Sequence, residues 1–320
     1  MKRFAFYALP LIAGAVFARA DDHLGPVTDI RVFGNEIYSC SQGGIFTGSG
    51  SELKFLMRPL RRTTSLGGVR DGDSFHLLFA GGEPGSAGAL GVFDLKSKTT
   101  RNIDFRGQDL VYDFAVLNDA SVVVAQANGE VHVGGGALPT SRQFELVYKH
   151  TAAARAVATS PDGRWFASAG RDGVIILSEI VEGKVGKSRK LLDHTSGVEC
   201  LVFSPDSQRL ASGSLDSKVR LHELPGKLVR TYDGLGMENE PVAGRVQSRV
   251  LALAWQDQLV AGTSKGILYR LSLGDDTSRR IARNGRDPIY ALAFDPRERL
   301  LLGGQGRIEI LTLGRKLSSP

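Results

Sequence analysis

An internal repeat with an offset of 44 residues is the feature that most constrains how this chain can fold. The segment "HTAAARAVATSPDGRWFASAGRDGVIILSEI" starts at His150, and "HTSGVECLVFSPDSQRLASGSLDSKVRLHEL" starts at His194. Each contains an apolar run, an S-P-D turn, a second run rich in Ala and Ser, a turn with Asp, and a third apolar run. Pro presets φ in such a turn and Asp can bond to the turn backbone, so both segments predict short strands joined by tight turns.

Fainter copies of the same unit fill the rest of the chain. They begin at Val27, Leu66, Val111, Val250 and Ile289, and each has apolar runs separated by turn residues. With the two clear repeats they make seven units of about 43 residues, the spacing of four-stranded propeller blades. We therefore expect an all-β fold, a seven-bladed β-propeller of four-stranded antiparallel blades, in one domain over residues 21–320.

The two clear repeats resemble the WD40 family in residues that share one spacing. These residues are His150, Ser168 and Asp172 in one repeat, and His194, Ser212 and Asp216 in the other. The resemblance implies that they form a buried hydrogen-bond network, which in that family includes a Trp on the third strand. Here Ser178-Glu179 and His222-Glu223 stand where the Trp-Asp pair would be. This departure predicts an incomplete network and blades held mainly by apolar packing.

The first 20 residues have the three parts of a secretory signal. Lys2 and Arg3 precede the apolar residues 4–17, and residues 18–20 read A-R-A, the form of a cleavage site. An apolar stretch of 14 residues is short for a bilayer span, so no membrane span is expected. These features predict cleavage after Ala20 and a periplasmic or secreted protein.

The same N-terminus has a second interpretation. Aligned with the repeats, residues 18–32 lie over residues 189–203, and the segment then reads as a fourth strand, a loop and a first strand. The seventh unit needs a fourth strand, and only "GRKLSSP" follows Leu313. If residues 16–20 form this strand and close the ring, the protein would be a cytoplasmic or nuclear scaffold. If they are cleaved off, "GRKLSSP" would have to supply the fourth strand, or the seventh blade would stay open.

Charge and cysteine content exclude several classes of protein. The formal charge of +6 falls to about +3 without Lys2, Arg3 and Arg19, and the basic run "RPLRRTT" has no aromatic residues for base stacking. No nucleic-acid partner is therefore expected. Cys40 and Cys200 form no C-x-x-C, which excludes a zinc ribbon, a thioredoxin-like pair and covalent haem attachment.

Short motifs with catalytic or metal-binding associations lack their required context. "GTSKG" (262–266) matches a nucleophile elbow but lies between two predicted strands, and "SELK" (51–54) lacks the further partners of its motif. The six histidines form no i, i+4 pair, and Asp71 and Asp73 lack the remaining ligands of a calcium loop. We expect no catalytic residue, no cofactor and no metal.

Two longer loops should emerge on one face of the disc. They are "GGEPGSAGA" (81–89) and "DGLGMENEPVAGRVQ" (233–247). Long loops on a rigid scaffold are frequent binding sites. The candidate contact residues in them are Glu83, Met237, Glu238, Glu240 and Arg245. The expected function is a non-catalytic protein-interaction scaffold that is monomeric by itself and holds its partner on this loop-rich face.

Narrower and alternative functions follow from the same features. Exported WD40-like proteins of this size resemble accessory factors found beside periplasmic nitrate reductases, which implies an assembly or docking role for a periplasmic respiratory or redox enzyme. The alternative is an enzyme or ligand binder that uses the central channel, with carboxylate, His or Trp side chains from several inner strands. Trp165 and Trp255 are the two tryptophans, and acidic residues show no regular placement there, which favours the scaffold.

Overall fold

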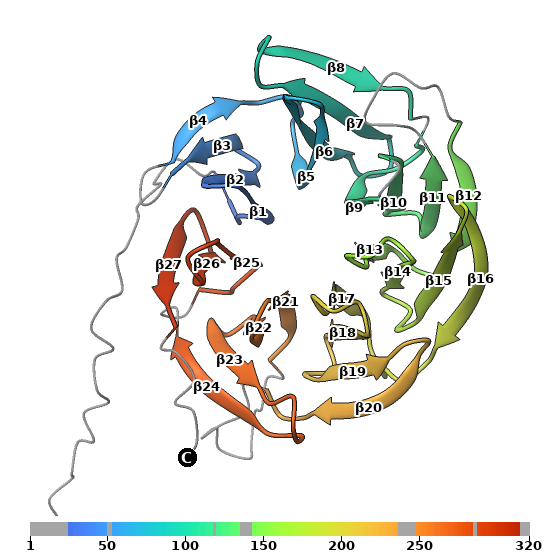
Figure 1. The fold of residues 1–320 in the computed structure, drawn as a ribbon, viewed down its shortest axis with the longest axis vertical. Helices are drawn as coiled ribbons and strands as arrows, with labels where there is room; N and C mark the ends of the chain where they lie inside the picture. The colour runs from blue at the N-terminus through green and yellow to red at the C-terminus, as the bar shows by residue number, and fades with distance from the viewer. Residues whose placement is uncertain are drawn as a thin grey trace, which may run out of the picture.

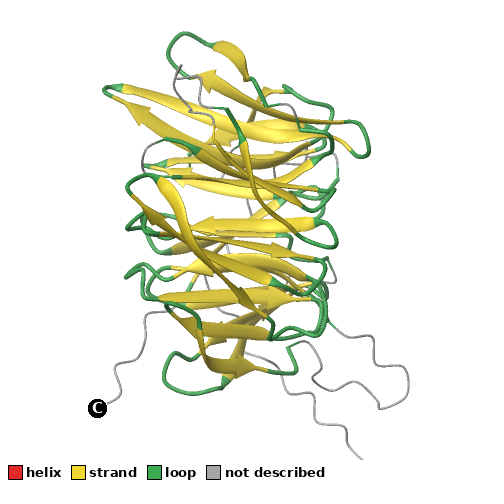
Figure 2. Ribbon diagram, turned by 90° about the vertical axis from the view of Figure 1, so that its right-hand side faces the viewer, coloured by secondary structure: helices red, strands yellow, loops and turns green. Residues whose placement is uncertain are grey.

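Seven antiparallel sheets stand around a central axis in the computed structural model, each forming one blade of a propeller (Figure 1). The structure describes residues 25–49, 53–105, 107–117, 120–134, 143–235, 248–283 and 287–313. Six sheets have four strands, and the seventh has three within the described residues. The side view shows a disc built from strands and loops (Figure 2). The predicted seven-bladed, all-β propeller is confirmed.

In each blade the strands follow one another in sequence order from the axis to the rim. The inner strands are β1 (Asp29–Phe33), β5 (Thr63–Asp71), β9 (Val111–Val116), β13 (Ala154–Thr159), β17 (Val198–Phe203), β21 (Val250–Trp255) and β25 (Ala291–Phe294). The second strands are β2 (Glu36–Ser41), β6 (Ser74–Glu83), β10 (Val122–Gln126), β14 (Trp165–Gly170), β18 (Arg209–Ser214), β22 (Leu259–Thr263) and β26 (Arg299–Gly303).

The other two layers complete the blades. The third strands are β3 (Gly44–Gly48), β7 (Ala87–Asp94), β11 (Glu130–Gly134), β15 (Ile175–Val181), β19 (Val219–Glu223), β23 (Ile267–Leu271) and β27 (Ile308–Thr312). The outer strands are β4 (Lys54–Met57), β8 (Thr99–Ile103), β12 (Glu145–Lys149), β16 (Lys184–Leu191), β20 (Lys227–Tyr232) and β24 (Ser278–Arg283).

Burial is greatest in the second strands of the blades and least in the outer strands. The second strands β10 ("VVVAQ") and β22 ("LVAGT") are buried at every position, because the neighbouring blades cover both of their faces. Continuous apolar runs of this length are typical of fully buried strands. The outer strand β16 ("KVGKSRKL") is exposed at six of its eight positions and carries the polar residues. Apolar runs along the chain therefore form the second strands of the blades, and runs rich in charged residues form the outer strands.

Apolar packing between neighbouring blades forms the core. Seven clusters of buried side chains fill the seven interfaces between blades. The cluster between blades 5 and 6, for example, contains Leu221, Tyr232, Leu253 and Tyr269. Burying side chains of this size contributes about 1.5–3 kcal/mol each relative to exposure. The ring is therefore stabilised at every interface, including the one between blade 7 and blade 1.

That last interface joins the two ends of the described chain. Val27 packs with Ile308, and its N–H donates to Gly304 O at 3.0 Å. Pro26 and Gln305 form a further bridge. The two segments considered for the fourth strand of blade 7, residues 16–20 and 314–320, lie outside the described residues.

The turns between second and third strands lie on the same face as the connections between blades. We call this face, which carries residues 150–153, 171–174, 192–197 and 215–218, the connector face. Gly129 lies in such a turn with φ +88°, and a Cβ there would come within 2.4 Å of His150 O in the adjacent connection. Glycine at this turn therefore permits the close approach of the two loops.

One loop prediction is wrong. The segment 81–89 was expected to be a long loop, but β6 continues to Glu83 and β7 begins at Ala87, so only residues 84–86 form a turn. Backbone pairing of Gly81 with Ala89 and of Gly82 with Gly88 extends the hairpin through the glycine-rich stretch. Glycine content suggested a loop, but the ladder hydrogen bonds override that preference.

Candidate functional site

The His, Ser and Asp residues of the first clear repeat come together at the connector face. His150 Nδ1 lies 3.2 Å from both carboxylate oxygens of Asp172, and His150 Nε2 lies 3.1 Å from Ser168 Oγ. The same carboxylate accepts from Thr151 N at 2.9 Å. Because a carboxylate only accepts, Nδ1 donates to it and Nε2 accepts from the Ser168 hydroxyl. These bonds fix the connection between blades 3 and 4 to the second-to-third turn of blade 4.

The second clear repeat repeats this arrangement and adds a guanidinium. His194 Nδ1 lies 3.0 Å from Asp216 Oδ2, and His194 Nε2 lies 2.8 Å from Ser212 Oγ. Arg220 Nη1 lies 2.9 Å from the same Asp216 oxygen, and its side chain is 8% exposed. The buried Asp216 therefore holds a histidine and an arginine together, an arrangement that blade 4 lacks within the described residues.

The electrostatic environment keeps both histidines neutral. Burial lowers the pKa of His150 and of His194, and the neighbouring carboxylates raise it only in part. Burial raises the pKa of Asp216, but its bonds to His194 and Arg220 outweigh that effect and hold the pKa well below its usual range. The networks are thus neutral imidazoles bonded to ionised carboxylates, which suits a structural role.

The residues in the place of the family's Trp have other partners. Ser178 Oγ lies 2.8 Å from Ser188 Oγ on the outer strand of the same blade. His222 is fully buried, and its Nε2 lies 2.8 Å from Asp193 Oδ2, while its Nδ1 has no partner. The residue that stands in the place of the Trp therefore has a different hydrogen-bond partner in each of the two blades.

Most of the candidate contact residues cannot be placed. Met237, Glu238, Glu240 and Arg245 lie outside the described residues. Glu83 ends β6, and its Oε1 lies 3.3 Å from Arg61 Nη1 in the connection between blades 1 and 2. Both side chains are more than half exposed, so this pair remains accessible on the connector face.

The catalytic and metal-binding motifs have ordinary structural positions. Residues 264–266 of "GTSKG" form the turn between β22 and β23, and Asp71 ends β5 while Asp73 lies in the turn before β6. Within the described residues no group of three His, Cys, Asp or Glu side chains could hold a metal ion. Cys40 and Cys200 are free thiols, and burial raises the pKa of both. The part of the chain that the structure describes contains no helix long and apolar enough to cross a membrane.

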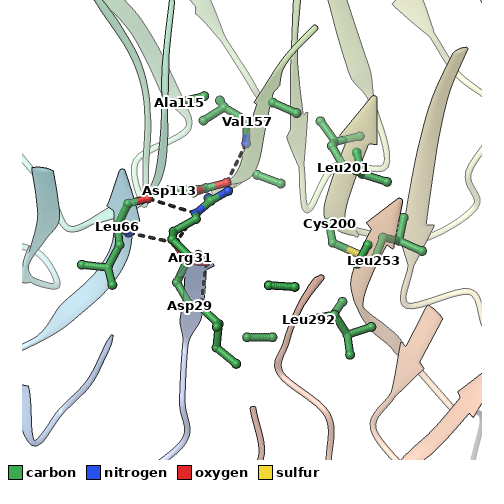
Figure 3. A pocket seen from close by; sticks show the side chains of 18 of the residues that line it. Asp29, Arg31, Leu66, Asp113, Ala115, Val157, Cys200, Leu201, Leu253 and Leu292 are labelled. Carbon is green, nitrogen blue, oxygen red and sulfur yellow. Dashed lines mark hydrogen bonds and ion pairs between the residues drawn. The ribbon is translucent and has the colours of Figure 1, made fainter. Parts of the chain in front are cut away.

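The central channel of the described structure contains a hollow with a volume of about 670 Å³. All seven inner strands line it. Blades 1 to 3 are joined there through two carboxylates (Figure 3). Asp29 Oδ2 accepts from Leu66 N at 2.8 Å, and Ser65 Oγ lies 2.7 Å from Asp113 Oδ1. Asp113 Oδ2 accepts from the N–H of Val157 in blade 4 at 3.0 Å.

Arg31 lies between these two carboxylates. Its Nε is 3.0 Å from Asp29 Oδ2 and 3.1 Å from Leu66 O, and its side chain is 42% accessible from the channel (Figure 3). The charge of Asp29, and to a smaller extent that of Asp113, raises the pKa of Arg31. Burial raises the pKa of Asp113 to about 6, although Arg31 lowers it. Two carboxylates thus share one guanidinium on this side of the channel.

A second charged chain lies where the channel meets the connector face. Arg155 Nη2 and Glu199 Oε2 are 3.0 Å apart, and Arg171 Nε lies 3.1 Å from Glu199 Oε1. The Arg155 guanidinium also stacks on Tyr112, 4.0 Å from the ring centroid. Glu199 is 6% exposed and Arg171 is 52% exposed, so a buried carboxylate positions an accessible guanidinium. This chain links blades 3, 4 and 5.

The opposite side of the channel is apolar. Its lining from blades 5, 6 and 7 includes Leu201, Leu251, Leu253, Trp255, Leu292 and Phe294. Three of these leucines face the charged cluster across the hollow (Figure 3). The channel therefore has a charged wall and an apolar wall.

Sequence reasoning missed the charged wall. It found no regular placement of acidic residues on the inner strands, yet Asp29 and Asp113 occupy the same position in "VTDI" and "VYDF". The register of each inner strand with its second strand places both carboxylates toward the neighbouring blade. Aligning the seven inner strands position by position would have found this pair.

Comparison with known proteins agrees with the geometry. The family described as WD domain, G-beta repeat matches residues 142–177 and 186–223, which contain the two His–Ser–Asp networks. Actin-interacting protein 1 from Drosophila melanogaster is 31% identical over 163 residues, 48% of this chain and 25% of that protein. Actin-interacting protein 1-2 from Arabidopsis thaliana is 29% identical over 215 residues, 66% of this chain and 29% of that protein.

Solved structures show the same fold. The WD40 β-propeller domain of Doa1 aligns over 94% of this chain and 96% of that one, with a TM-score of 0.70 and 17% identity. This chain covers less than a third of the length of the two matched relatives, so their names describe larger proteins. The residues of blades 4 and 5 thus match the WD-domain repeat, and the described chain as a whole has the fold of a WD40 propeller.

Proposed function

We propose that this protein is a non-catalytic scaffold that binds a protein partner on its connector face. The observation that carries the proposal is the Arg155–Glu199–Arg171 chain beside the channel mouth. The buried carboxylate holds Arg171 in place before a partner arrives, which reduces the entropy lost on binding. Arginine is also among the residues that contribute most to protein interfaces.

The relatives support this class of function. The two matched proteins named above are called actin-interacting proteins, a name that describes binding to another protein. The fold itself is compatible with many functions, so the proposal depends on the site and not on the fold.

A binding experiment with a matched control tests the proposal. Arg171→Glu reverses the charge of the exposed end of the chain, whereas Arg164→Glu makes the same change in the β13–β14 turn on the opposite face. We expect the first variant to lose at least tenfold in affinity for a partner captured by the wild-type protein, and the second to retain it. Equal affinities of both variants, with unchanged thermal unfolding, would overturn the connector-face assignment.

We also propose that the scaffold is exported, with residues 1–20 removed as a signal. The charged start, the apolar stretch and the A-R-A sequence support this proposal. N-terminal sequencing of the protein purified from its native cells should start at Asp21. Retention of residues 16–20 would instead support the cytoplasmic alternative and their use as a strand.

A narrower proposal concerns the identity of the partner. Size, fold and the signal-like N-terminus support an accessory role for a periplasmic respiratory or redox enzyme, such as nitrate reductase. Mass spectrometry of proteins that bind the wild type but not Arg171→Glu, from a periplasmic extract, tests it. Recovery of partners without a redox cofactor would remove this narrower proposal and leave the scaffold proposal intact.

The charged wall of the channel favours a second candidate function, the binding of a small ligand. Asp29, Arg31 and Asp113 lie opposite an apolar wall, which suits a molecule with a polar head and an apolar body. Native mass spectrometry of the purified protein should then detect a retained ligand that Arg31→Met loses. A wild-type mass equal to that of the polypeptide chain would count against this candidate.

A further inference from the structure

The outer strands of blades 4, 5 and 6 carry a strong excess of positive charge. Strands β16, β20 and β24, which we call the basic wall, contain no Asp or Glu. Their basic residues are Lys184, Lys187, Arg189, Lys190, Lys227, Arg230, Arg279, Arg280 and Arg283. The whole chain has 40 basic and 34 acidic residues, so this excess is local and does not reflect the composition.

The other three outer strands differ from the basic wall. Strands β4, β8 and β12 together carry three basic residues, Lys54, Arg101 and Lys149, and one acidic residue, Glu145. Lys149 is paired with Glu130 at 3.1 Å. The two halves of the rim therefore have the same secondary structure and different charge.

Most charges of the basic wall are accessible. Lys184, Lys187 and Arg189 are exposed, and no ion pair within 4 Å joins them to a described acidic residue. Arg230 is paired with Asp276 at 3.6 Å, and Asp276 lies in the turn before β24. Glu179 and Glu223 lie on the neighbouring strands β15 and β19, whereas β16, β20 and β24 themselves carry only basic charges.

Protection of strand edges accounts for part of this charge but not for its amount. A lysine on an outer strand discourages pairing with another chain. One basic residue per strand is present on β4 and β8, whereas the three strands of the basic wall carry nine. The excess beyond edge protection calls for a binding partner of opposite charge.

We propose that the basic wall binds an acidic segment of a polypeptide partner. The three strands follow the convex rim of the disc (Figure 1), so a flat bilayer could touch only part of the wall, whereas a flexible chain can follow the curve. Tyr232, the aromatic residue of these strands, is fully buried, which leaves no ring for stacking with nucleic-acid bases. The site is separate from Arg171 and does not depend on the connector-face proposal.

Binding of this kind depends on the number of contacts. A single exposed ion pair contributes about 0.2–1 kcal/mol and is screened by salt. Several such contacts along one acidic segment add up to a micromolar to millimolar affinity that falls steeply with ionic strength. The expected interaction is therefore weak by itself and useful as a second attachment point for a partner that is also held elsewhere.

The test measures binding of a fluorescent Glu-rich peptide by anisotropy at low and moderate salt. The variant Lys184→Gln/Lys187→Gln/Arg189→Gln removes three charges from the basic wall. The control Lys54→Gln/Lys96→Gln/Lys98→Gln removes three exposed charges from blades 1 and 2. We expect the first variant to lose about tenfold or more in affinity. The control should lose less than threefold.

Three results would overturn the proposal. Absence of peptide binding by the wild type would show that the charge serves edge protection. An equal loss in the control variant would show that net charge, and not the basic wall, drives binding. Tighter binding of a single-stranded oligonucleotide or of phosphatidylserine vesicles than of the peptide would assign the wall to a different partner. Because Arg171 is not part of the basic wall, failure here leaves the connector-face proposal standing.

Discussion

The inner strands are joined in two different ways on the two sides of the channel. From blade 1 to blade 5 the links are polar, through Asp29, Ser65, Asp113, Arg155 and Glu199. Between blades 5, 6 and 7, no side-chain hydrogen bond joins the described inner strands, and Cys200, Ala252 and Ala291 stand at the positions of Asp29 and Asp113. Farther from the axis, blades 5 and 6 are also joined by polar contacts, because Tyr232 Oη donates to Ser272 O and Arg230 pairs with Asp276, so the contrast concerns the inner strands.

The difference indicates what the polar side contributes. Buried ion pairs are weak evidence for stability, because desolvation offsets much of the attraction. Hydrogen bonds from Asp29 and Asp113 to backbone N–H groups instead fix the register of one inner strand against the next. We infer that the polar half orients the connector face around Arg171, whereas the apolar half mainly closes the ring.

The largest expected effect is a loss of packing in the apolar half. Leu253→Ala should lower the free energy of unfolding by about 2–4 kcal/mol, because a buried leucine between blades 5 and 6 leaves a cavity when truncated. Urea unfolding followed by circular dichroism measures the change. Leu228→Ala, on an outer strand where the leucine is 39% exposed, is the control and should change stability by less than about 0.5 kcal/mol. A loss below about 1 kcal/mol for Leu253→Ala would contradict the packing argument.

A smaller effect is expected in the polar half. Asp29→Ala removes the acceptor of Leu66 N and the partner of Arg31, which should cost about 1–3 kcal/mol. The same urea experiment measures it, with Ser65→Ala as a milder control. Because Leu253 and Asp29 share no partner, the double variant should be additive within about 0.5 kcal/mol. Strong coupling between the two sites would show that the ring halves are not independent.

The sequence predicted the repeat architecture well and the inner site poorly, and there is a physical reason for each. The blade unit depends on local features, the S-P-D turns and the apolar runs around His150 and His194, which can be read directly from the chain. Neighbouring blades then have to pack in order around an axis. The number of units and their spacing therefore sufficed to predict the ring.

The charged wall depends on contacts between residues far apart in the chain. Ser65 and Asp113 are 48 residues apart, and no local pattern in the sequence marks the two as members of one site. The hairpin around residues 84–86 shows the opposite error. Its glycine-rich sequence predicts a loop, but the pairing of β6 with β7 makes most of the stretch part of two strands. Long-range pairing, and not local preference, decides both cases.

The smallest expected effect is a pH dependence at Asp113. Burial raises the pKa of this carboxyl from 3.8 to about 6 in the folded protein, so the folded state binds the proton more tightly than the unfolded chain does. The stabilisation by that proton is complete below about pH 4 and is lost as the pH rises through about 6. The wild type should therefore lose stability relative to Asp113→Asn between about pH 4 and pH 6, by at most about 1.4 kcal/mol per pH unit.

The comparison with Asp113→Asn separates this effect from that of the histidines. Burial lowers the pKa of His150 and His194, so their contribution to stability is lost as the pH falls and has the opposite sign. Both proteins contain these histidines, and their effect cancels in the difference between the two unfolding free energies. A difference that stays constant between about pH 4 and pH 6 would mean that water in the channel solvates Asp113 as well as it does in the unfolded chain. The polar half would then be held by hydrogen bonds to a well-solvated carboxylate. The two halves would differ in the hydrogen bonds between their inner strands and not in how deeply their side chains are buried.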